Sequence, residues 1–352
     1  MNKRKKATIH DIASKLGITA STVSRALNNH PRISDATKKL VTKAAKDINY
    51  QPNNIAAALR NGKSRLIGII VPTVNRNFFS SVVRGIEEIA NQLNYKVIIS
   101  QSYENFEQEV QIVDTLLSAR VDGIIMSISK NTENFEHLDR VKEKNIPLVL
   151  FDRITDSVEV NQVVIDDYMG AYKTVEHLIA NGYKRIAHFT NPRKINIYSE
   201  RMRGYIDALK AHGMEYDQNL VIESNMQLED GQQCVKTMLD QGLEFDAIFS
   251  SSDYAAMGAL QALKERGIAI PAQVGLAGFG NEPFTSFTTP SLTSVDQVSI
   301  PMGNVAAELF FELLKADPKK YVPQKTVLKP DLIIRESSTR TPSKPNSTPN
   351  SK

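Results

Sequence analysis

The stretch TIHDIASKLGITASTVSRALNN (residues 8–29) combines two helix start signals with one stop signal. Thr8 and Thr19 are of a residue type that caps helix N-termini, and Gly17 between them favours a helix end. From Ile18 to Asn29 the segment holds four hydroxyl side chains and one arginine, and its apolar stripe is thin. Two short helices joined by a tight glycine turn are typical of a helix-turn-helix unit, whose second helix lies in the DNA major groove. Small polar groups suit a helix in that position, whereas an apolar outer face does not.

The residues that follow complete a three-helix head. Ser34 is a third capping residue, and after it Leu40, Val41, Ala44 and Ile48 recur at the spacing of one helix face. The pattern predicts a third helix that packs these residues against the first two helices.

A short alanine-rich segment, NNIAAAL (residues 53–59), follows the head. Alanine and leucine are good helix formers, but an isolated helix of this length is not stable in water. We therefore expect a hinge helix that forms only with a partner. The nearby NGKS is not a phosphate-binding loop, because Ala57 stands where that loop requires its first glycine.

Charge is distributed unevenly along the 352 residues. Residues 1–65 carry 14 lysines and arginines and three aspartates, a net formal charge of +11, whereas the remainder carries −7. A basic head on an acidic body indicates a module that binds a polyanion such as DNA. Considered without its helix pattern, the basic charge of the head could also serve solubility or attach the protein to a membrane surface.

The composition is that of a globular protein with more than one domain. Hydrophobic residues make up 41% and charged residues 23%, and the chain is too long for one ordinary core. There is no apolar run of membrane-spanning length, and the basic N-terminus leads into no apolar signal segment, so we expect a cytoplasmic protein. Cys234 is the single cysteine, which fits a reducing compartment. Cysteine and histidine do not occur at zinc-ligand spacing, and we expect no metal or cofactor.

From Leu66 onward, buried-strand patterns alternate with amphipathic-helix patterns. Apolar runs such as LIGIIV (66–71) are followed by segments with helical periodicity, which predicts parallel sheets with crossover helices. Two series of similar length indicate two lobes. Segments 293–296, 302–315 and 326–334 come after both series and are expected to complete the lobes.

The expected fold is an all-α helix-turn-helix head joined to an α/β core of two doubly wound parallel-sheet lobes. The expected boundaries are a head over 1–52, a hinge helix and linker over 53–65, a core over 66–337 and a polar, disordered tail over 338–352. Within the core, we expect lobe 1 to contain 66–165 plus 293–322, and lobe 2 to contain 166–292 plus 323–337.

Several motifs resemble the LacI/GalR family of bacterial transcription regulators. In the head they are TIHDIASKLGITASTVSRALNNHPRISDATKKLV and INYQPNNIAAAL, and the spacing of TVSRALN and YQPN is highly specific. In the core they are LFDR, VVIDDYMGAYKTVEHLIANGYKRIAHFTNP, SERMRGY, SSDYAAMGAL, TTPSLTSVDQ and LIIRESS. The resemblance covers residues 7–337.

The resemblance implies a core of periplasmic-binding-protein type and a homodimer whose heads bind a near-palindromic operator. A small-molecule effector, a sugar or sugar derivative, is expected in the cleft between the lobes, where it alters lobe closure, the hinge helices and the affinity for DNA. A repressor is the expected kind of regulator. Independently, ligands of open α/β sheets bind at the carboxyl ends of the strands.

For the head, the resemblance implies base contacts by Ala20, Ser21 and Arg25. An arginine can pair with guanine through two hydrogen bonds, and a phosphate contact is the alternative for Arg25. Leu59 matches a hinge residue that wedges into the central minor groove, and packing along the helix face is its alternative. The other DNA-binding candidates, which are caps, phosphate contacts or hinge positions, are Thr8, Thr19, Thr22, Ser24, Asn28, Asn53 and Ala56.

For the cleft, the resemblance implies the effector-binding positions Phe78, Phe79, Asp152, Arg153, Arg201, Met226, Asp253 and Asn281. An aromatic ring can stack on a sugar or base, or at least one of the two phenylalanines is plain core. The carboxylate of Asp152 can accept hydrogen bonds from hydroxyls. Arg201 either donates to the ligand or forms an ion pair between the lobes. Asp253 either contacts the ligand or caps the following helix.

One motif departs from the family pattern. Where many members have an aspartate, this chain has Gly280 within GFGNEP (278–283). An acceptor for sugar hydroxyls is therefore missing, so that Asn281 or Glu282 substitutes for it or the ligand differs.

Two other classes of function compete with a regulator. A sugar-binding transport receptor explains the core but needs an export signal and has no use for a basic helix-turn-helix head. An enzyme of the doubly wound class needs a catalytic constellation, and the sequence contains no nucleophile elbow, phosphate loop or metal cluster. We therefore expect a regulator and not an enzyme.

Overall fold

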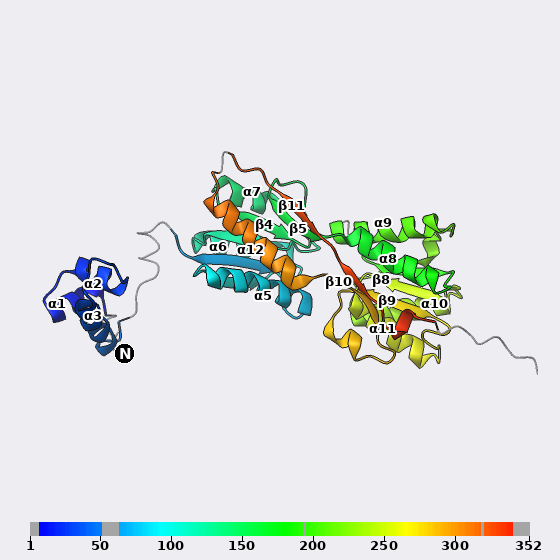
Figure 1. The fold of residues 1–352 in the computed structure, drawn as a ribbon. Coiled ribbons are helices and arrows are strands. Elements are labelled where there is room, and N and C mark those ends of the chain that lie inside the picture. Colours follow the sequence, from blue (N-terminus) through cyan, green and yellow to red (C-terminus); the bar gives the residue numbers. More distant parts are fainter. Residues whose placement is uncertain (1–6, 51–62, 193–194, 318–319, 341–352) are drawn as a thin grey trace, which may run out of the picture. The chain divides into compact units, whose positions relative to one another are not determined.

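The computed structural model describes residues 7–50, 63–192, 195–317 and 320–340 (Figure 1). The chain forms two compact units, which divide between Ser64 and Arg65. None of the helices among the described residues is long and apolar enough to cross a membrane.

The first unit is a head of three helices, α1 (Ile9–Leu16), α2 (Ala20–Leu27) and α3 (Asp35–Asp47). Thr8 and Asp11 form a capping box at the start of α1, and Gly17 ends the helix in the left-handed conformation at φ +65°. The side chains of Thr19 and Ser34 accept backbone hydrogen bonds at the starts of α2 and α3. The predicted helices and caps of the head are thus confirmed.

The core of the head is small and apolar. Ile12, Val23 and Val41 are fully buried, one from each helix. The prediction was wrong for Leu40, which is 59% exposed. Leu40 lies about 100° around α3 from Val41, so it cannot share the face that packs against α1 and α2.

The first lobe of the second unit contains a parallel sheet in the order β2-β1-β3-β4-β5-β11. Its strands in chain order are β1 (Leu66–Val71), β2 (Lys96–Gln101), β3 (Gly123–Met126), β4 (Leu148–Phe151), β5 (Asn161–Ile165) and β11 (Lys325–Leu328). Ile67 and Ile69 of β1 pack in one hydrophobic cluster and Ile70 packs in another, so the sheet is covered on both faces. The helices α5 (Asn77–Gln92) and α12 (Ser299–Lys315) cover one face, and α6 (Phe106–Ser118) and α7 (Glu136–Glu143) cover the other.

The second lobe repeats this plan with the strand order β7-β6-β8-β9-β10-β12. Its strands are β6 (Ile186–Thr190), β7 (Val221–Glu223), β8 (Ala247–Ser250), β9 (Gly275–Phe279), β10 (Thr293–Asp296) and β12 (Asp331–Ile333). They are parallel except β12, which pairs antiparallel with β10 at the edge. The covering helices are α8 (Asp167–Ala180) with α9 (Asn196–Ala211), and α10 (Leu228–Asp240) with α11 (Asp253–Glu265). Three short 3₁₀ helices are also present in the described residues of this lobe, η1 (Gln218–Leu220), η2 (Pro283–Ser286) and η3 (Glu336–Ser338).

The chain passes between the lobes after β5, after β10 and after β11, and the last of these passages is the red segment in Figure 1. The predicted assignment of the C-terminal segments to the two lobes was wrong for two strands. Strand β10 (Thr293–Asp296) belongs to lobe 2, because it pairs with β9, and β11 (Lys325–Leu328) belongs to lobe 1, because it pairs with β5. Both assignments depend on strand pairings between segments that are distant in the sequence, and the strand patterns alone do not specify such pairings.

The ordered chain also continues into the expected tail. Ser338 is fully buried, and its hydroxyl hydrogen-bonds to Thr293 and His177. The Arg340 guanidinium lies 3.9 Å from the ring centroid of Tyr183 and donates to the carbonyl of Gly182. The prediction of a tail from residue 338 was therefore wrong for residues 338–340, and the remainder of the tail lies outside the described residues.

Candidate functional site

The outer face of α2 has the polar character that its sequence predicted. Val23 and Ala26 are buried against the head, whereas Ser21, Arg25 and Asn28 are exposed. These three residues lie three or four positions apart, so they share one side of the helix. Among the described residues, the guanidinium of Arg25 has no hydrogen bond or ion pair. The geometry leaves this side chain available to a base edge or a phosphate.

The hydroxyls at the start of α2 are largely engaged with one another. The side chain of Thr19 caps the helix by accepting from the Thr22 amide and lies 2.9 Å from the hydroxyls of both Ser21 and Thr22. Asn28 donates to the carbonyl of Ser24 at the other end of the helix. These contacts fix the helix ends and leave Ala20, which is half-buried, beside the exposed Ser21.

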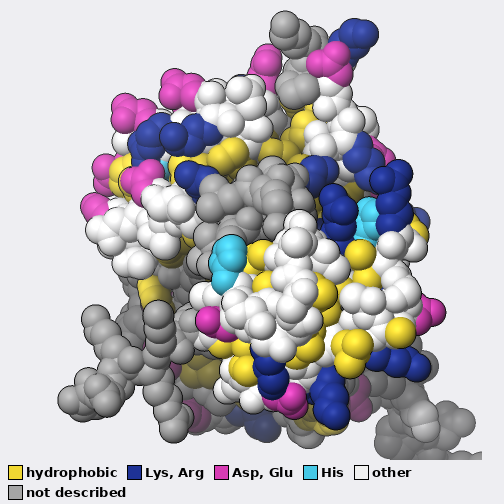
Figure 2. Space-filling model, turned by 90° about the vertical axis from the view of Figure 1, so that its left-hand side faces the viewer, with side chains coloured by type: hydrophobic (Ala, Val, Ile, Leu, Met, Phe, Trp, Pro, Cys, Tyr) yellow, Lys and Arg dark blue, Asp and Glu magenta, His cyan; other side chains and the backbone are white. Residues whose placement is uncertain are grey.

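The head is basic in sequence, and its basic side chains are dispersed. Lys15 lies in α1, Arg25 in α2 and Lys46 in α3, so the cations are not confined to one helix. Lys and Arg side chains occur at several separate places on the face of the molecule drawn in Figure 2. Dispersed cations of this kind suit contacts to successive phosphates better than one compact anion. The hinge candidates Asn53, Ala56 and Leu59 lie outside the described residues.

A cavity of about 410 Å³ lies between the two lobes. Its walls come from the segments that follow β1 to β4 in lobe 1 and β6 to β10 in lobe 2. This is the carboxyl edge of both parallel sheets, where open α/β folds bind ligands. The lining includes the predicted residues Phe78, Phe79, Asp152, Arg153, Arg201, Met226 and Asp253.

Asn281 is not part of this lining. Its amide nitrogen donates to Asp296, and its amide oxygen accepts from Arg335, so both ends of the side chain are held elsewhere. Glu282, the alternative that the sequence left open, does line the cavity. The structure thus places Glu282, and not the predicted Asn281, on the cavity wall.

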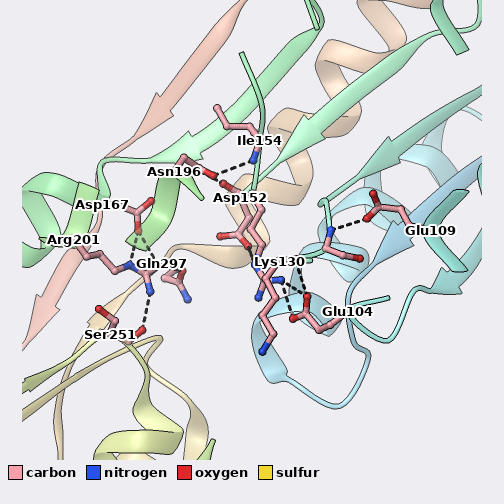
Figure 3. Close-up of polar contacts among 12 residues, drawn as sticks. Glu104, Glu109, Lys130, Asp152, Ile154, Asp167, Asn196, Arg201, Ser251 and Gln297 are labelled. Atoms are coloured by element: carbon pink, nitrogen blue, oxygen red, sulfur yellow. Dashed lines mark hydrogen bonds and ion pairs between the residues drawn. The ribbon is translucent and has the colours of Figure 1, made fainter. Parts of the chain in front are cut away.

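Asp152 stands at the centre of the lobe 1 wall. It is 5% exposed and adopts a left-handed backbone at φ +60°, a conformation that is costly for aspartate and concentrates at functional sites. Asn196 of lobe 2 holds this turn, since its amide donates to the carbonyl of Asp152 and accepts from the amide of Ile154 (Figure 3). Burial raises the pKa of the Asp152 carboxyl, and the charge of Arg153 opposes this effect.

Arg153 is tied to a carboxylate that the sequence did not single out. Its Nη1 lies 2.8 Å from both carboxylate oxygens of Glu104, which also accepts from the backbone amide of Lys130. Burial acts to raise the pKa of Glu104, but Arg153 and the Lys130 amide together lower it. Figure 3 shows Glu104 and Lys130 side by side on the lobe 1 side of the site. Glu104 follows β2 in SYENF, where a strand end was the available signal.

Arg201 is engaged within lobe 2 rather than between the lobes. Its Nε donates to Asp167 at 2.8 Å and its Nη1 donates to the carbonyl of Ser251 at 2.8 Å (Figure 3). Its Nη2 donates to Gln297 at 3.2 Å and lies 2.7 Å from the Asp167 carboxylate. The guanidinium also stacks on Phe279 at 3.6 Å from the ring centroid. Most of its donors are thus used by the protein itself.

The remaining predicted positions combine structural and cavity roles. The rings of Phe78 and Phe79 contact each other edge to face, with 5.1 Å between their centroids. Both side chains belong to the hydrophobic core as well as to the cavity wall. Met226 is 2% exposed with a left-handed backbone at φ +64°. Ser252, not Asp253, caps α11 through its side chain. Asp253 instead accepts from Ser294 and from the Glu282 amide, and burial raises its pKa to about 7.

Comparisons with known proteins agree with this architecture. Residues 8–53 match the family described as bacterial regulatory proteins, lacI family, and residues 64–320 match periplasmic binding proteins and sugar binding domain of LacI family. Catabolite control protein A of Priestia megaterium is 30% identical over 95% of this chain and 99% of its own. The repressor CytR of Escherichia coli is 30% identical over 88% of this chain and 90% of its own.

Solved structures show the same likeness. The lac repressor dimer bound to operator and the anti-inducer ONPF has a TM-score of 0.85 at 25% identity, covering 96% of this chain and all of that one. The regulator CcpA of Lactococcus lactis has a TM-score of 0.71 at 32% identity, covering 78% of this chain and 99% of that one. These relatives are transcription regulators and not enzymes. With a matching head, a matching core and relatives aligned along nearly their whole length, this chain belongs to the LacI family of bacterial regulatory proteins.

Proposed function

We propose that the protein is a cytoplasmic repressor that binds a palindromic operator as a dimer. A small molecule, a sugar or sugar derivative, binds the interlobe cavity and changes the affinity for DNA. The observation that carries the proposal is the cavity itself, which is lined from both lobes and includes seven of the residues expected there. A ligand that contacts both lobes binds best at one degree of closure, and that difference in affinity is what shifts a conformational equilibrium.

The chemistry of the cavity favours a polyhydroxylated ligand. Aromatic side chains such as Phe78, Phe79 and Tyr254 provide apolar faces, and Asp152 and Asp253 provide carboxylates that accept hydrogen bonds from hydroxyls. Mixed apolar surface with a few buried polar groups is typical of small-molecule sites.

The function is tested by separating the two units. The full chain is expected to bind its operator, and a sugar that raises its melting temperature is expected to change that binding in a gel-shift assay. A fragment of residues 65–340 is expected to keep dimerisation and the sugar-induced thermal shift but to lose operator binding, because the exposed face of α2 is absent from it. Retention of full operator binding by the fragment contradicts the assignment of the head.

The hinge gives a second test. Ordering a segment costs roughly 1–2 kcal/mol per residue, so residues 53–61 are expected to become helical only where two hinges pack together on DNA. Ala57→Gly should then weaken operator binding by about 1 kcal/mol per hinge through lower helix propensity. Sugar affinity measured without DNA should remain nearly unchanged.

Hydrogen exchange over residues 53–61 measures the hinge directly. Protection is expected with operator and not without it. If these amides are equally protected with and without operator, the hinge is preformed. The proposal that the effector acts through folding of the hinge is then wrong.

A further inference from the structure

The carboxylate of Glu282 reaches from lobe 2 to lobe 1. Its backbone amide donates to Asp253 at 2.8 Å, which fixes the segment after β9. Its carboxylate accepts from the amide of Asn77, the first residue of α5, at 3.3 Å. Glu282 is 6% exposed and lines the cavity. An acidic side chain is therefore held at the point where the lobes meet across the cleft.

The start of α5 has no side-chain cap from its own segment. Its N-cap residue is Arg76, whose side chain accepts no hydrogen bond from the helix. A helix N-terminus carries unsatisfied amides and a partial positive charge, and both attract an anion. Glu282 supplies that anion from the opposite lobe. Burial raises the pKa of Glu282, while the amides of Asn77 and Phe78 and the charge of Arg76 oppose that effect.

Arg76 adds a second attraction for anions at this end of the cavity. Its guanidinium lies 3.3 Å from the ring centroid of Tyr254, and it donates to Gln227 through Nη2. Its Nη1 is buried without a hydrogen-bond partner among the described residues. Arg76 is close enough to Glu282 for its charge to act on that carboxylate, which also accepts from the first amide of α5. An oxyanion in place of the carboxylate would meet the same two attractions.

The other cations of the cavity also lie beside carboxylates of the protein. Arg153 pairs with Glu104, and Arg201 pairs with the buried Asp167. Lys130 lies close enough to Glu104 to lower its pKa. A phosphorylated or carboxylated ligand would have to displace one of these carboxylates, whereas a neutral polyol would not.

We infer that Glu282 is a specificity-determining residue, whose carboxylate occupies the position for a ligand's anionic group and so selects an uncharged, polyhydroxylated effector. The inference rests on the proposed function of the cavity. It also explains the departure at Gly280, whose backbone has φ +135°, a conformation that favours glycine. A Cβ at position 280 would lie 3.2 Å from the carboxylate of Asp253, so a side chain there would be crowded. The acidic residue of this segment is instead Glu282, two positions later in the chain.

The test uses the full chain with inorganic phosphate as the probe, in chloride buffer of matched ionic strength. Glu282→Gln keeps the size of the side chain and removes its charge, and Glu229→Gln removes an exposed carboxylate from the same lobe. We expect Glu282→Gln to bind phosphate at least about tenfold more tightly than wild type by calorimetry, since a like charge has been removed. Glu229→Gln is expected to match wild type. The head is identical in wild type and both variants, so any phosphate that binds to the head contributes equally to all three measurements.

Equal phosphate binding by wild type and Glu282→Gln, or binding by neither, overturns the inference. If Glu282→Gln does not fold, the inference is tested on the wild-type protein, by measuring how pentoses, hexoses and their phosphate esters change its melting temperature. A shift with the free sugar and none with its ester supports the inference, and a larger or equal shift with the ester overturns it. Operator binding tests the proposed function separately, because none of these outcomes depends on DNA.

Discussion

Arg201→Ala is expected to lower the free energy of unfolding of the core by about 3–5 kcal/mol, the cost of removing one partner from a buried ion pair. Arg201 and Asp167 are each 4% exposed, and the guanidinium also donates to Ser251 and Gln297. Alanine leaves the Asp167 carboxylate buried without its cation. Urea unfolding without any ligand, followed by circular dichroism, measures the loss.

The loss is expected to depend on pH in one direction. Burial raises the pKa of Asp167 to about 7, and the charge of Arg201 works against this. Without Arg201 the pKa in the folded state rises further. A group whose pKa is raised on folding contributes stability below its unfolded pKa and loses it as the pH rises through the folded pKa. The deficit of Arg201→Ala should therefore be smaller in mildly acidic buffer than in mildly alkaline buffer.

Arg203→Ala is the matched control on the same helix. The Arg203 side chain is 57% exposed, pairs with Glu200 and stacks on Tyr168 at 4.2 Å from the ring centroid. Loss of an exposed pair is expected to cost less than about 1 kcal/mol. If Arg201→Ala were equally mild but abolished sugar binding, Arg201 would be a ligand arginine and not a structural one.

Local chemistry explains which parts of the fold the sequence predicts well. The starts of α1, α2 and α3 follow from Thr8, Thr19 and Ser34, because each cap is formed within a few residues of its helix. The alternation of strands and helices is equally local, and it predicts two doubly wound lobes. The lobe to which a late strand belongs is not local. Strand β10 pairs with β9 and β11 pairs with β5, and no sequence pattern specifies these partners.

The candidate site divides in the same way. The resemblance to the LacI/GalR family points to positions such as Asp152 and Arg153 because they occur in recognisable motifs. It does not reveal what occupies the donors of Arg153 and Arg201, since Glu104 and Asp167 are distant in sequence from the arginines they neutralise. The contact between Glu282 and the start of α5 joins residues 205 positions apart. Such partners determine the charge of the cavity, and they emerge only from the folded chain.

Arg25→Ala is expected to remove preference at one base pair of each operator half-site and to weaken binding to the preferred sequence by about 1–3 kcal/mol for each arginine–guanine pair. Arg25 lies on the exposed face of α2, opposite the buried Val23 and Ala26. Its guanidinium has no other partner among the described residues, so the fork can form both hydrogen bonds to a guanine. Binding to a library of operator variants measures the preference at each position.

A basic residue that contacts only phosphate behaves differently in the same experiment. Lys5→Ala and Lys6→Ala serve as controls from the N-terminal basic segment, which lies outside the described residues. Each is expected to weaken all operator variants alike and to reduce the slope of log affinity against log salt by about 0.9 for each phosphate that the lysine neutralises. Arg25→Ala should instead flatten the preference among variants, because base edges carry sequence information and phosphates do not. A uniform loss for Arg25→Ala with base preferences intact would make Arg25 a phosphate contact, and operator choice would then depend on other residues of α2.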